Sequence, residues 1–169
     1  MRRATADDIA AIAYHRYAMF RDMGSASADL ADELQERTRR YLRQAMPSGE
    51  YVGWVAAPAA EPARVVAGAG AQLRRILPRF NDARDRVVEG RQAIVVNVFT
   101  EPEFRRQGLA RQLMLAVLAW ARDERLDSLV LHAAKDGRAL YESLGFTQTN
   151  EMRYTAGELA RWTRPAAAS

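Results

Sequence analysis

The chain has 169 residues, of which 49% are hydrophobic and 27% are charged, and its formal net charge is +4. This length suits one domain with a sizeable core. Because the sequence has no cysteine and only two histidines, His15 and His132, it excludes a disulfide framework and a thiol nucleophile and argues against a histidine-based metal site.

The N-terminus does not follow the pattern of a secretory signal. Arg2-Arg3 is followed closely by Asp7-Asp8, and the chain contains no long uncharged apolar run. We therefore expect a cytoplasmic protein with no removable signal and no membrane partner.

The positive charge comes almost entirely from arginine, because Lys135 is the only lysine. Such a surface could attract nucleic acid or a polyanionic small ligand, such as a phosphorylated cofactor. The arginines are spread along the chain, however, and lack the regular aromatic interleaving of a surface that binds single strands. We therefore do not expect a nucleic-acid partner.

Two helices are predicted near the N-terminus. Thr5 and Asp8 form a capping-box pattern before a helix that should end at Gly24. Ser25 and Ser27 are alternative caps for the second helix. The two helices would form a lid or a substrate wall if they cover a sheet, and the alternative is plain packing.

Residues 51–56 and 65–73 both read as strands, and the proline- and alanine-rich segment between them predicts an antiparallel pair. Gly68 and Gly70 form a short G-x-G, but no third glycine and no helix follow as in a dinucleotide-binding loop, so close packing explains them better. The arginine-rich residues 74–91 predict a mobile connection near the mouth of the site, or a plain solvated loop.

An apolar run from Ile94 to Phe99 predicts a buried strand in which Asn97 is the single polar side chain. Strict alternation would place Val95, Asn97 and Phe99 on one face. Asn97 is then either a bonded core amide or a pocket residue.

The strand is followed by Glu101 and Pro102. Proline cannot continue a central ladder, so the strand should part from its neighbour near this point. Glu101 is a candidate general base, and the alternative is a solvent-exposed carboxylate beside the arginines.

A tight basic turn, Phe104-Arg105-Arg106-Gln107-Gly108-Leu109-Ala110, then leads into a segment with apolar residues at helical spacing. The order of strand, basic turn and helix is typical of an anion cradle. Turn N–H groups and the positive end of the helix dipole would face the anion, and Gly108 has no Cβ to obstruct it.

Residues 128–134 read as a second buried strand, which should lie parallel to the first because a helix connects them. His132 near its end reads as a packed or rim histidine more readily than as a catalytic one. A helix should follow and close at Gly145. The remaining expectations are strands at 146–149 and 151–155 and a small helix at 156–162.

Two motifs occur in order in this half of the chain. The first is Arg105-x-x-Gly108-x-Ala110, and the second, about thirty residues later, is Gly137-x-x-Leu140-Tyr141-Glu142-x-Leu144-Gly145-Phe146. Together they resemble the GNAT superfamily of acetyl-CoA-dependent N-acetyltransferases over residues 93–154. The resemblance implies an α+β (α/β) fold with a mixed, mostly antiparallel, twisted sheet of about six or seven strands, a parallel central pair and about four flanking helices. It implies one domain over residues 1–164 with a frayed tail at 165–169.

The resemblance also implies where acetyl-CoA binds. The strand end would contact the pantetheine arm, and turn amides from Arg106 to Arg111 would hold the pyrophosphate. Many members carry an asparagine seven residues before the motif tyrosine, where this chain has Ala134, so Lys135 or Arg138 could supply charge instead. The implied cofactor-binding residues are Val98, Phe99, Thr100, Arg105, Arg106, Gln107, Gly108, Leu109, Ala110, Arg111, Lys135 and Arg138.

The implied reaction is direct transfer of the acetyl group to a primary amine of a small molecule or peptide, without a metal. Tyr141 would be the general acid for the departing thiolate, and its alternative role is a packed aromatic. Glu101 would be the base, or Asn97 would act through water with a distant carboxylate. The alternatives to an enzyme are an acetyl-CoA-binding sensor and a basic nucleic-acid-binding protein, and a homodimer is left open.

Overall fold

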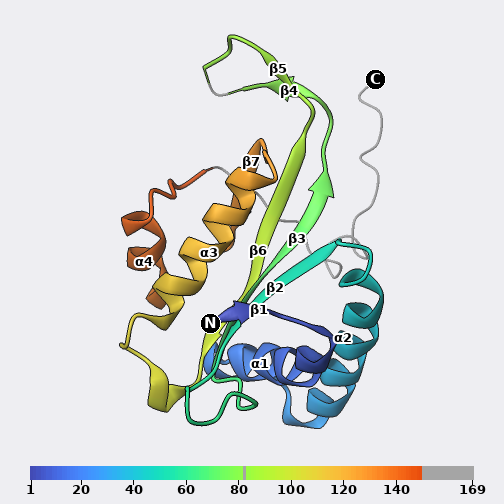
Figure 1. Cartoon of the computed structure of the whole chain (residues 1–169), viewed down its shortest axis with the longest axis vertical. Helices are drawn as coiled ribbons and strands as arrows, with labels where there is room; N and C mark the ends of the chain where they lie inside the picture. The colour runs from blue at the N-terminus through green and yellow to red at the C-terminus, as the bar shows by residue number, and fades with distance from the viewer. Residues whose placement is uncertain (82, 150–169) are drawn as a thin grey trace, which may run out of the picture. The chain divides into compact units, whose positions relative to one another are not determined.

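The computed structural model describes residues 1–81 and 83–149 (Figure 1). The chain divides into two compact units, one from Met1 to Lys135 and one that begins at Asp136. Each unit is described by itself below, and the single domain expected over residues 1–164 stays a prediction. No helix in the described part of the chain is long and apolar enough to span a membrane.

The first unit is built on a five-stranded sheet with the order β1-β2-β3-β6-β7 (Figure 1). All neighbouring strands are antiparallel except β6 and β7, which are parallel. The mixed, mostly antiparallel sheet is confirmed, but among the described residues the parallel pair lies at one end of the order and not at its centre. The strands are β1 (Arg2–Arg3), β2 (Tyr51–Ala56), β3 (Ala67–Arg75), β6 (Arg91–Thr100) and β7 (Ser128–Leu131).

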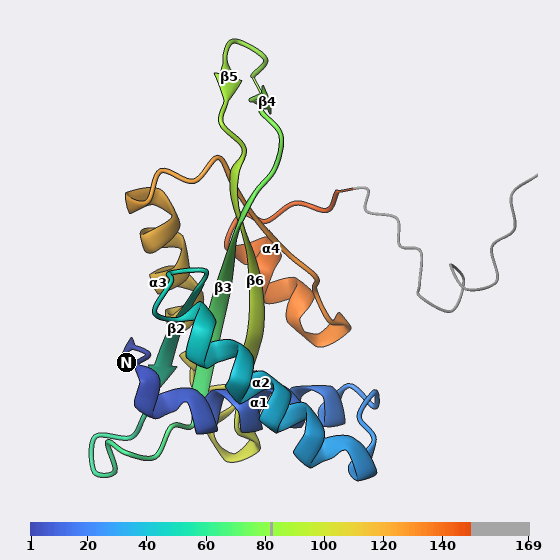
Figure 2. The same ribbon diagram turned by 90° about the vertical axis from the view of Figure 1, so that its right-hand side faces the viewer.

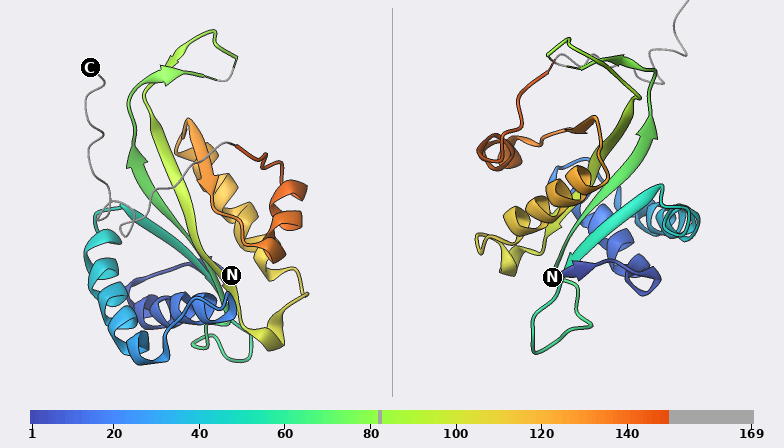
Figure 3. Two further views of the ribbon diagram at one scale, coloured as in Figure 1. Left: turned by 180° about the vertical axis from the view of Figure 1, so that it is seen from behind. Right: turned by 45° about the horizontal axis from the view of Figure 1, so that its top comes forward.

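Three long helices pack against this sheet. Helices α1 (Ile9–Asp22) and α2 (Ala31–Ala45) lie together on one side, and α3 (Leu109–Asp123) lies on the other (Figure 1, Figure 2 and Figure 3). Trp54 of β2 meets Trp120 of α3 edge-on at 5.5 Å between ring centroids. On the opposite side, one core cluster joins the first two helices to the sheet through Ile9, Ile12, Leu42, Ala45, Tyr51, Val55 and Val65.

The capping box expected before the first helix is present. Asp8 accepts a hydrogen bond from the Thr5 N–H at 2.8 Å and forms an ion pair with Arg2 at 2.6 Å. Ser25 acts differently from the expectation, because its hydroxyl donates to the Phe20 carbonyl and so completes the end of α1. Ser27 precedes the short 3-10 helix Ala28–Leu30 without a capping side-chain bond.

Residues 74–91 are not a plain connection. They extend β3 and β6 and carry a small antiparallel hairpin of β4 (Arg79–Phe80) and β5 (Val87–Val88). Since β6 starts at Arg91 and reaches the basic turn only after Thr100, this hairpin lies at the far end of the strand from the turn (Figure 1). The expectation that it borders the mouth of the site was wrong.

The G-x-G of β3 has a packing role, as expected. A Cβ at Gly70 would lie 2.2 Å from the hydroxyl oxygen of Tyr51, so only glycine leaves room for this buried ring. At Gly68 the nearest atom, the Trp54 carbonyl oxygen, would be 3.3 Å away.

The second unit contains α4 (Arg138–Ser143), which follows a 3-10 helix at Lys135–Gly137 and ends before Gly145, whose φ is +90°. Residues 146–149 do not form the expected strand. The expected strand at 151–155, the helix at 156–162 and the tail at 165–169 lie outside the described residues.

Candidate active site

A β-bulge interrupts β6 at Asn97. Gly70 pairs with Val96 and Gly68 pairs with Phe99, so one residue of β3 faces two residues of β6. Asn97 adopts the left-handed conformation with φ of +59°, which asparagine tolerates better than most residues. The bulge places Val96 and Asn97 against the same pocket, so strict alternation fails at this point. Asn97 and Phe99 nevertheless both face α1, as expected.

Strand β6 also extends well beyond its parallel partner. The β6–β7 register ends at Val95 and Leu131, whereas β6 continues to Thr100. The parting of strands expected near Pro102 therefore occurs, and it begins earlier. On its β7 side, the backbone of Val98, Phe99 and Thr100 lies outside the β6–β7 ladder.

The basic turn contains residues with a left-handed backbone conformation, at the place where the sequence predicted a tight turn. Arg106 and Gly108 have φ of +62° and +80°, and Gly108 is the residue that precedes α3. A Cβ at Gly108 would meet nothing within 4 Å, so the surface there is open. The Gln112 N–H makes a helical bond to the Gly108 carbonyl at 3.0 Å, and the N–H groups of Leu109, Ala110 and Arg111 precede that ladder.

The Arg105 side chain turns away from this cradle. Its guanidinium pairs with Asp22 at the end of α1, and its Nε donates to the Thr100 carbonyl at 2.9 Å. The hydrogen bond from Arg105 lowers the pKa of Asp22. These contacts tie the turn to α1, while the Gln107 side chain donates to the Glu103 carbonyl at 3.3 Å.

Glu101 lies beside a buried histidine that sequence reasoning did not connect with it. His15 Nε2 is 3.8 Å from Glu101 Oε1, longer than a hydrogen bond, and the His15 side chain is only 1% exposed. The rings of His15 and Phe99 are 5.0 Å apart. Burial lowers the pKa of His15, so the ring is neutral at pH 7. Glu101 Oε2 is also 3.5 Å from Arg64, which competes for this carboxylate.

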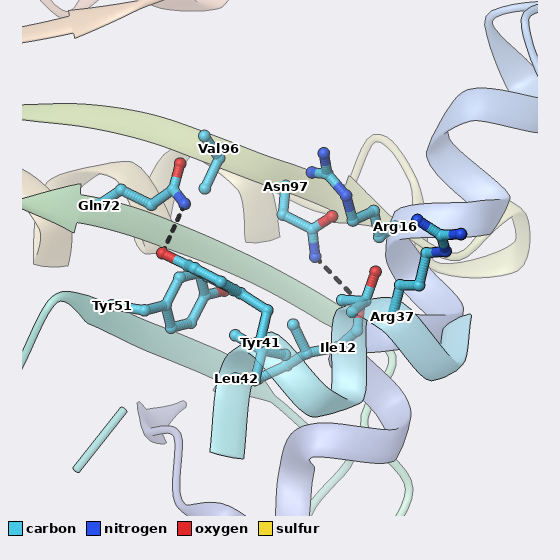
Figure 4. Close-up of a pocket in the computed structure, with 10 residues that line it drawn as sticks. Ile12, Arg16, Arg37, Tyr41, Leu42, Tyr51, Gln72, Val96 and Asn97 are labelled. Carbon is cyan, nitrogen blue, oxygen red and sulfur yellow. Dashed lines mark hydrogen bonds between the residues drawn. The ribbon is translucent and has the colours of Figure 1, made fainter. Parts of the chain in front are cut away.

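A pocket of about 260 Å³ opens between α1, α2 and the sheet (Figure 4). Asn97 donates its side-chain N–H to the Ile12 carbonyl at 3.1 Å, while its Oδ1 is buried without a partner among the described residues. Asn97 is thus both a bonded amide and a pocket residue. The lining residues are Ile12, Arg16, Arg37, Thr38, Tyr41, Leu42, Tyr51, Gln72, Val96 and Asn97.

The polar side chains at one end of this pocket already form hydrogen bonds within the protein. Gln72 Nε2 donates to the Tyr41 hydroxyl at 2.8 Å, and that hydroxyl donates to Glu50 at 2.7 Å. Burial and the bond to Glu50 raise the pKa of Tyr41, and burial raises the pKa of Tyr51. Both phenols are therefore neutral at physiological pH.

Tyr141 belongs to the second unit. Its ring is half-buried and meets Phe146 edge-on at 6.0 Å between centroids. A Cβ at Gly137 would lie 2.9 Å from this ring, so glycine there gives the tyrosine its room. Burial raises the pKa of Tyr141, which keeps its hydroxyl protonated.

The remaining residues singled out from the sequence are on the surface. Lys135 and Arg138 are exposed at the end of the first unit and the start of α4. His132 is exposed just after β7 and is not packed in a core. Within residues 1–81 and 83–149, no group of three or more acidic, histidine or cysteine side chains is placed to hold a metal ion.

Solved structures share this architecture. A GCN5-related N-acetyltransferase from Ralstonia eutropha JMP134 is 26% identical, has a TM-score of 0.80 and aligns over 92% of this chain and 97% of its own. A predicted acetyltransferase with acetyl-CoA from Clostridium acetobutylicum is 24% identical, with a TM-score of 0.75 over 91% and 93% of the two chains. A possible acetyltransferase from Clostridium difficile 630 is 22% identical, with a TM-score of 0.67 over 91% and 93%.

A search of curated protein sequences found none that matches the chain. The family described as "Acetyltransferase (GNAT) family" matches residues 9–146. This match takes in both motifs, the bulged strand and the turn before α3. With the fold and the matched sequence in agreement over most of its length, the chain belongs to the acetyltransferase (GNAT) family.

Proposed function

We propose that the chain transfers the acetyl group of acetyl-CoA to a primary amine of a small molecule or peptide. Acetyl-CoA is the co-substrate of the family. The observation that carries the proposal is the combination of a β6 extension that continues beyond the β6–β7 ladder with a left-handed, open glycine at the start of α3. Together they offer backbone groups for an extended arm and N–H groups for phosphates.

In this proposal, the backbone of Val98, Phe99 and Thr100 binds the pantetheine arm. The amides from Arg106 to Arg111 bind the pyrophosphate, with Gly108 allowing close approach. Lys135 and Arg138 supply positive charge in place of the contact that Ala134 lacks. Arg105 holds the turn against Asp22 and Thr100, so it positions the cradle through its side chain.

The bound co-substrate supplies an acetyl thioester. The amine nitrogen forms a bond to the acetyl carbon as the carbon–sulfur bond breaks, so one proton must leave the nitrogen and one must reach the sulfur. Tyr141 is the proposed donor to the sulfur, since its hydroxyl stays protonated. Glu101 is the proposed acceptor of the amine proton, either directly or through water near Asn97.

The neutral His15 ring beside Glu101 is a group that sequence reasoning missed. We assign it a positioning role for the Glu101 carboxylate. No spacing rule in the sequence links the two, because they meet only when α1 packs against β6.

Two measurements test the proposed function. Calorimetric titration with acetyl-CoA should show saturable binding, and a thiol-detecting assay should show free coenzyme A on adding amines. Binding without thiol release with any amine would support the sensor alternative, and no binding would overturn the assignment. A cytoplasmic location and a homodimer stay predictions.

A further inference from the structure

The pocket between α1 and α2 contains a positive charge that no carboxylate of the described residues balances. Arg16 is half-buried on α1 and stacks over the Phe20 ring at 5.0 Å. Within the described part of the chain, no carboxylate lies within ion-pair distance of its guanidinium. Burial lowers the pKa of Arg16. A guanidinium removed from water in this way is stabilised when an anion pairs with it.

The neighbouring arginine differs in this respect. Arg37 lines the same pocket from α2, but it is bonded to Glu33 at 2.5 Å and its side chain is 67% exposed. Its charge is therefore already compensated and solvated. Of the two arginines that line this pocket among the described residues, Arg16 is the one available to a ligand.

A second polar group in the pocket, the side-chain oxygen of Asn97, needs a hydrogen-bond donor instead of an anion. Because the Ile12 carbonyl can only accept a hydrogen bond, the Asn97 amide must present its NH₂ to Ile12 and its Oδ1 elsewhere. That oxygen is buried and without a partner among the described residues. A buried acceptor of this kind is stabilised by a donor, and an ammonium or amine N–H supplies one.

The two groups lie on the same side of the pocket. Figure 4 shows the Arg16 side chain reaching toward Asn97, away from the Tyr41 and Gln72 pair at the other end. The polar side chains at that other end are already hydrogen-bonded within the protein. The unsatisfied donor and acceptor are thus concentrated in one part of a space of about 260 Å³.

We propose that the acceptor substrate is a small amine that carries an anionic group, a carboxylate or a phosphate, with the anion bound by Arg16 and the amine by Asn97 Oδ1. This proposal rests on the proposed acetyl transfer, because it names the amine for that reaction. Asn97 lies on the β6 bulge, next to Val98, so an amine held there would lie close to the strand segment that is proposed to bind the pantetheine arm. The pocket is smaller than the roughly 300–1,000 Å³ of sites for drug-sized ligands, so it suits a compact head group.

The test is a titration followed by ¹⁵N–¹H NMR, which reports binding without turnover. Matched pairs compare L-alanine, L-leucine and L-phenylalanine with ethylamine, 3-methylbutylamine and 2-phenylethylamine, which lack only the carboxylate. O-phosphoethanolamine is compared with ethanolamine in the same way. In at least one pair the anionic member should bind about tenfold or more tightly, and it should shift the Arg16 Nε–H and Asn97 side-chain signals.

Variants locate the effect. Arg16→Gln should abolish the preference for the anionic member, and Arg16→Lys should restore part of it by returning the charge. Arg40→Gln is the matched control, because Arg40 is an exposed arginine of α2 outside the pocket lining, and it should leave the preference intact. Equal or weaker binding of the anionic member in every pair, or a preference that survives in Arg16→Gln, would overturn the proposal.

The same samples separate this proposal from the proposed function. An Arg16-dependent preference without thiol release from acetyl-CoA would leave the anion-binding pocket standing and refute acetyl transfer. Thiol release that is equally fast with both members of every pair would support acetyl transfer and refute the anion-binding pocket. A preference seen with the amino acids alone identifies a carboxylate, and one seen with O-phosphoethanolamine alone identifies a phosphate.

Discussion

Asn97 on β6 donates its side-chain N–H to the Ile12 carbonyl of α1 at 3.1 Å, across 85 residues of sequence. This bond joins the first helix to the strand at the point where the strand bulges. The same residue has a left-handed backbone and lines the pocket, so its side chain contributes to stability and also to the proposed substrate site.

Replacing Asn97 should separate its backbone role from its hydrogen bond. Asn97→Ala forces a non-glycine, non-asparagine residue into the left-handed region and removes the bond, so we expect a loss of about 2 kcal/mol in the free energy of unfolding. Asn97→Gly also removes the hydrogen bond to Ile12, but glycine adopts the left-handed conformation without strain. The loss in the free energy of unfolding should therefore be about 1 kcal/mol smaller than in the alanine variant. Urea unfolding measures both, and equal stability of the two variants would contradict the backbone argument.

Gly108 should matter for acetyl-CoA more than for folding. Gly108→Glu places bulk and negative charge at the proposed phosphate site, so acetyl-CoA affinity should fall by about tenfold or more. Gly49→Glu is the matched control, because Gly49 also has a left-handed backbone, φ of +75°, with nothing within 4 Å of a Cβ, in the loop before β2. Calorimetry should show unchanged affinity in the control. Unchanged affinity in Gly108→Glu would mean that the cradle is misplaced.

Tyr141→Phe removes the proposed general acid while keeping the ring that packs on Phe146. We expect kcat to fall by about 100-fold with little change in acetyl-CoA affinity. Because burial raises the pKa of Tyr141, the wild-type enzyme should show no loss of the acid form below the ordinary tyrosine range, about pH 10. A steady-state pH profile of kcat tests this, and an unchanged kcat and profile in the variant would exclude the role.

His15 should make stability depend on pH. Burial lowers the pKa of His15 in the folded state, so the unfolded chain binds more protons, and stability is lost as the pH falls below the unfolded histidine value of about 6.5. The free energy of unfolding should therefore rise between about pH 5 and 7, by at most about 1.4 kcal/mol per pH unit from this one group.

The variant His15→Phe should flatten that rise, since phenylalanine does not titrate and suits the apolar contact with Phe99. His132→Gln is the control, because His132 is exposed, and it should keep the wild-type slope. Urea unfolding at several pH values gives both slopes. A slope that persists in His15→Phe would assign the effect to another group.

Much of the fold could be predicted because it depends on local patterns. The capping box placed the first helix, apolar spacing placed both N-terminal helices, and the apolar run placed β6, since these signals act within a few residues. The bulge could not be predicted in the same way. It depends on how β3, with Gly68 and Gly70, pairs with β6, which is a relation between distant segments.

The hairpin at 79–88 and the end of β7 could not be predicted either, because both depend on pairing between distant segments. The arginine-rich segment 74–91 has no strong strand period, so its pairing is decided by the extension of β3 and β6 on either side. Residues 132–134 read as strand, but β7 ends at Leu131, and the sequence alone does not say where a parallel partner stops.

For the site, the turn at Arg105–Ala110 and the motif around Tyr141 could be predicted from the sequence, because glycine, basic residues and their spacing are local chemistry that carries the family resemblance. Three features became known from the folded chain alone: the direction of Arg105 toward Asp22, the proximity of His15 to Glu101, and the pocket lined by Arg16 and Asn97. Burial and partnership are properties of packed segments far apart in the chain. The charge that Arg16 leaves unbalanced therefore becomes visible only once α1, α2 and β6 are assembled.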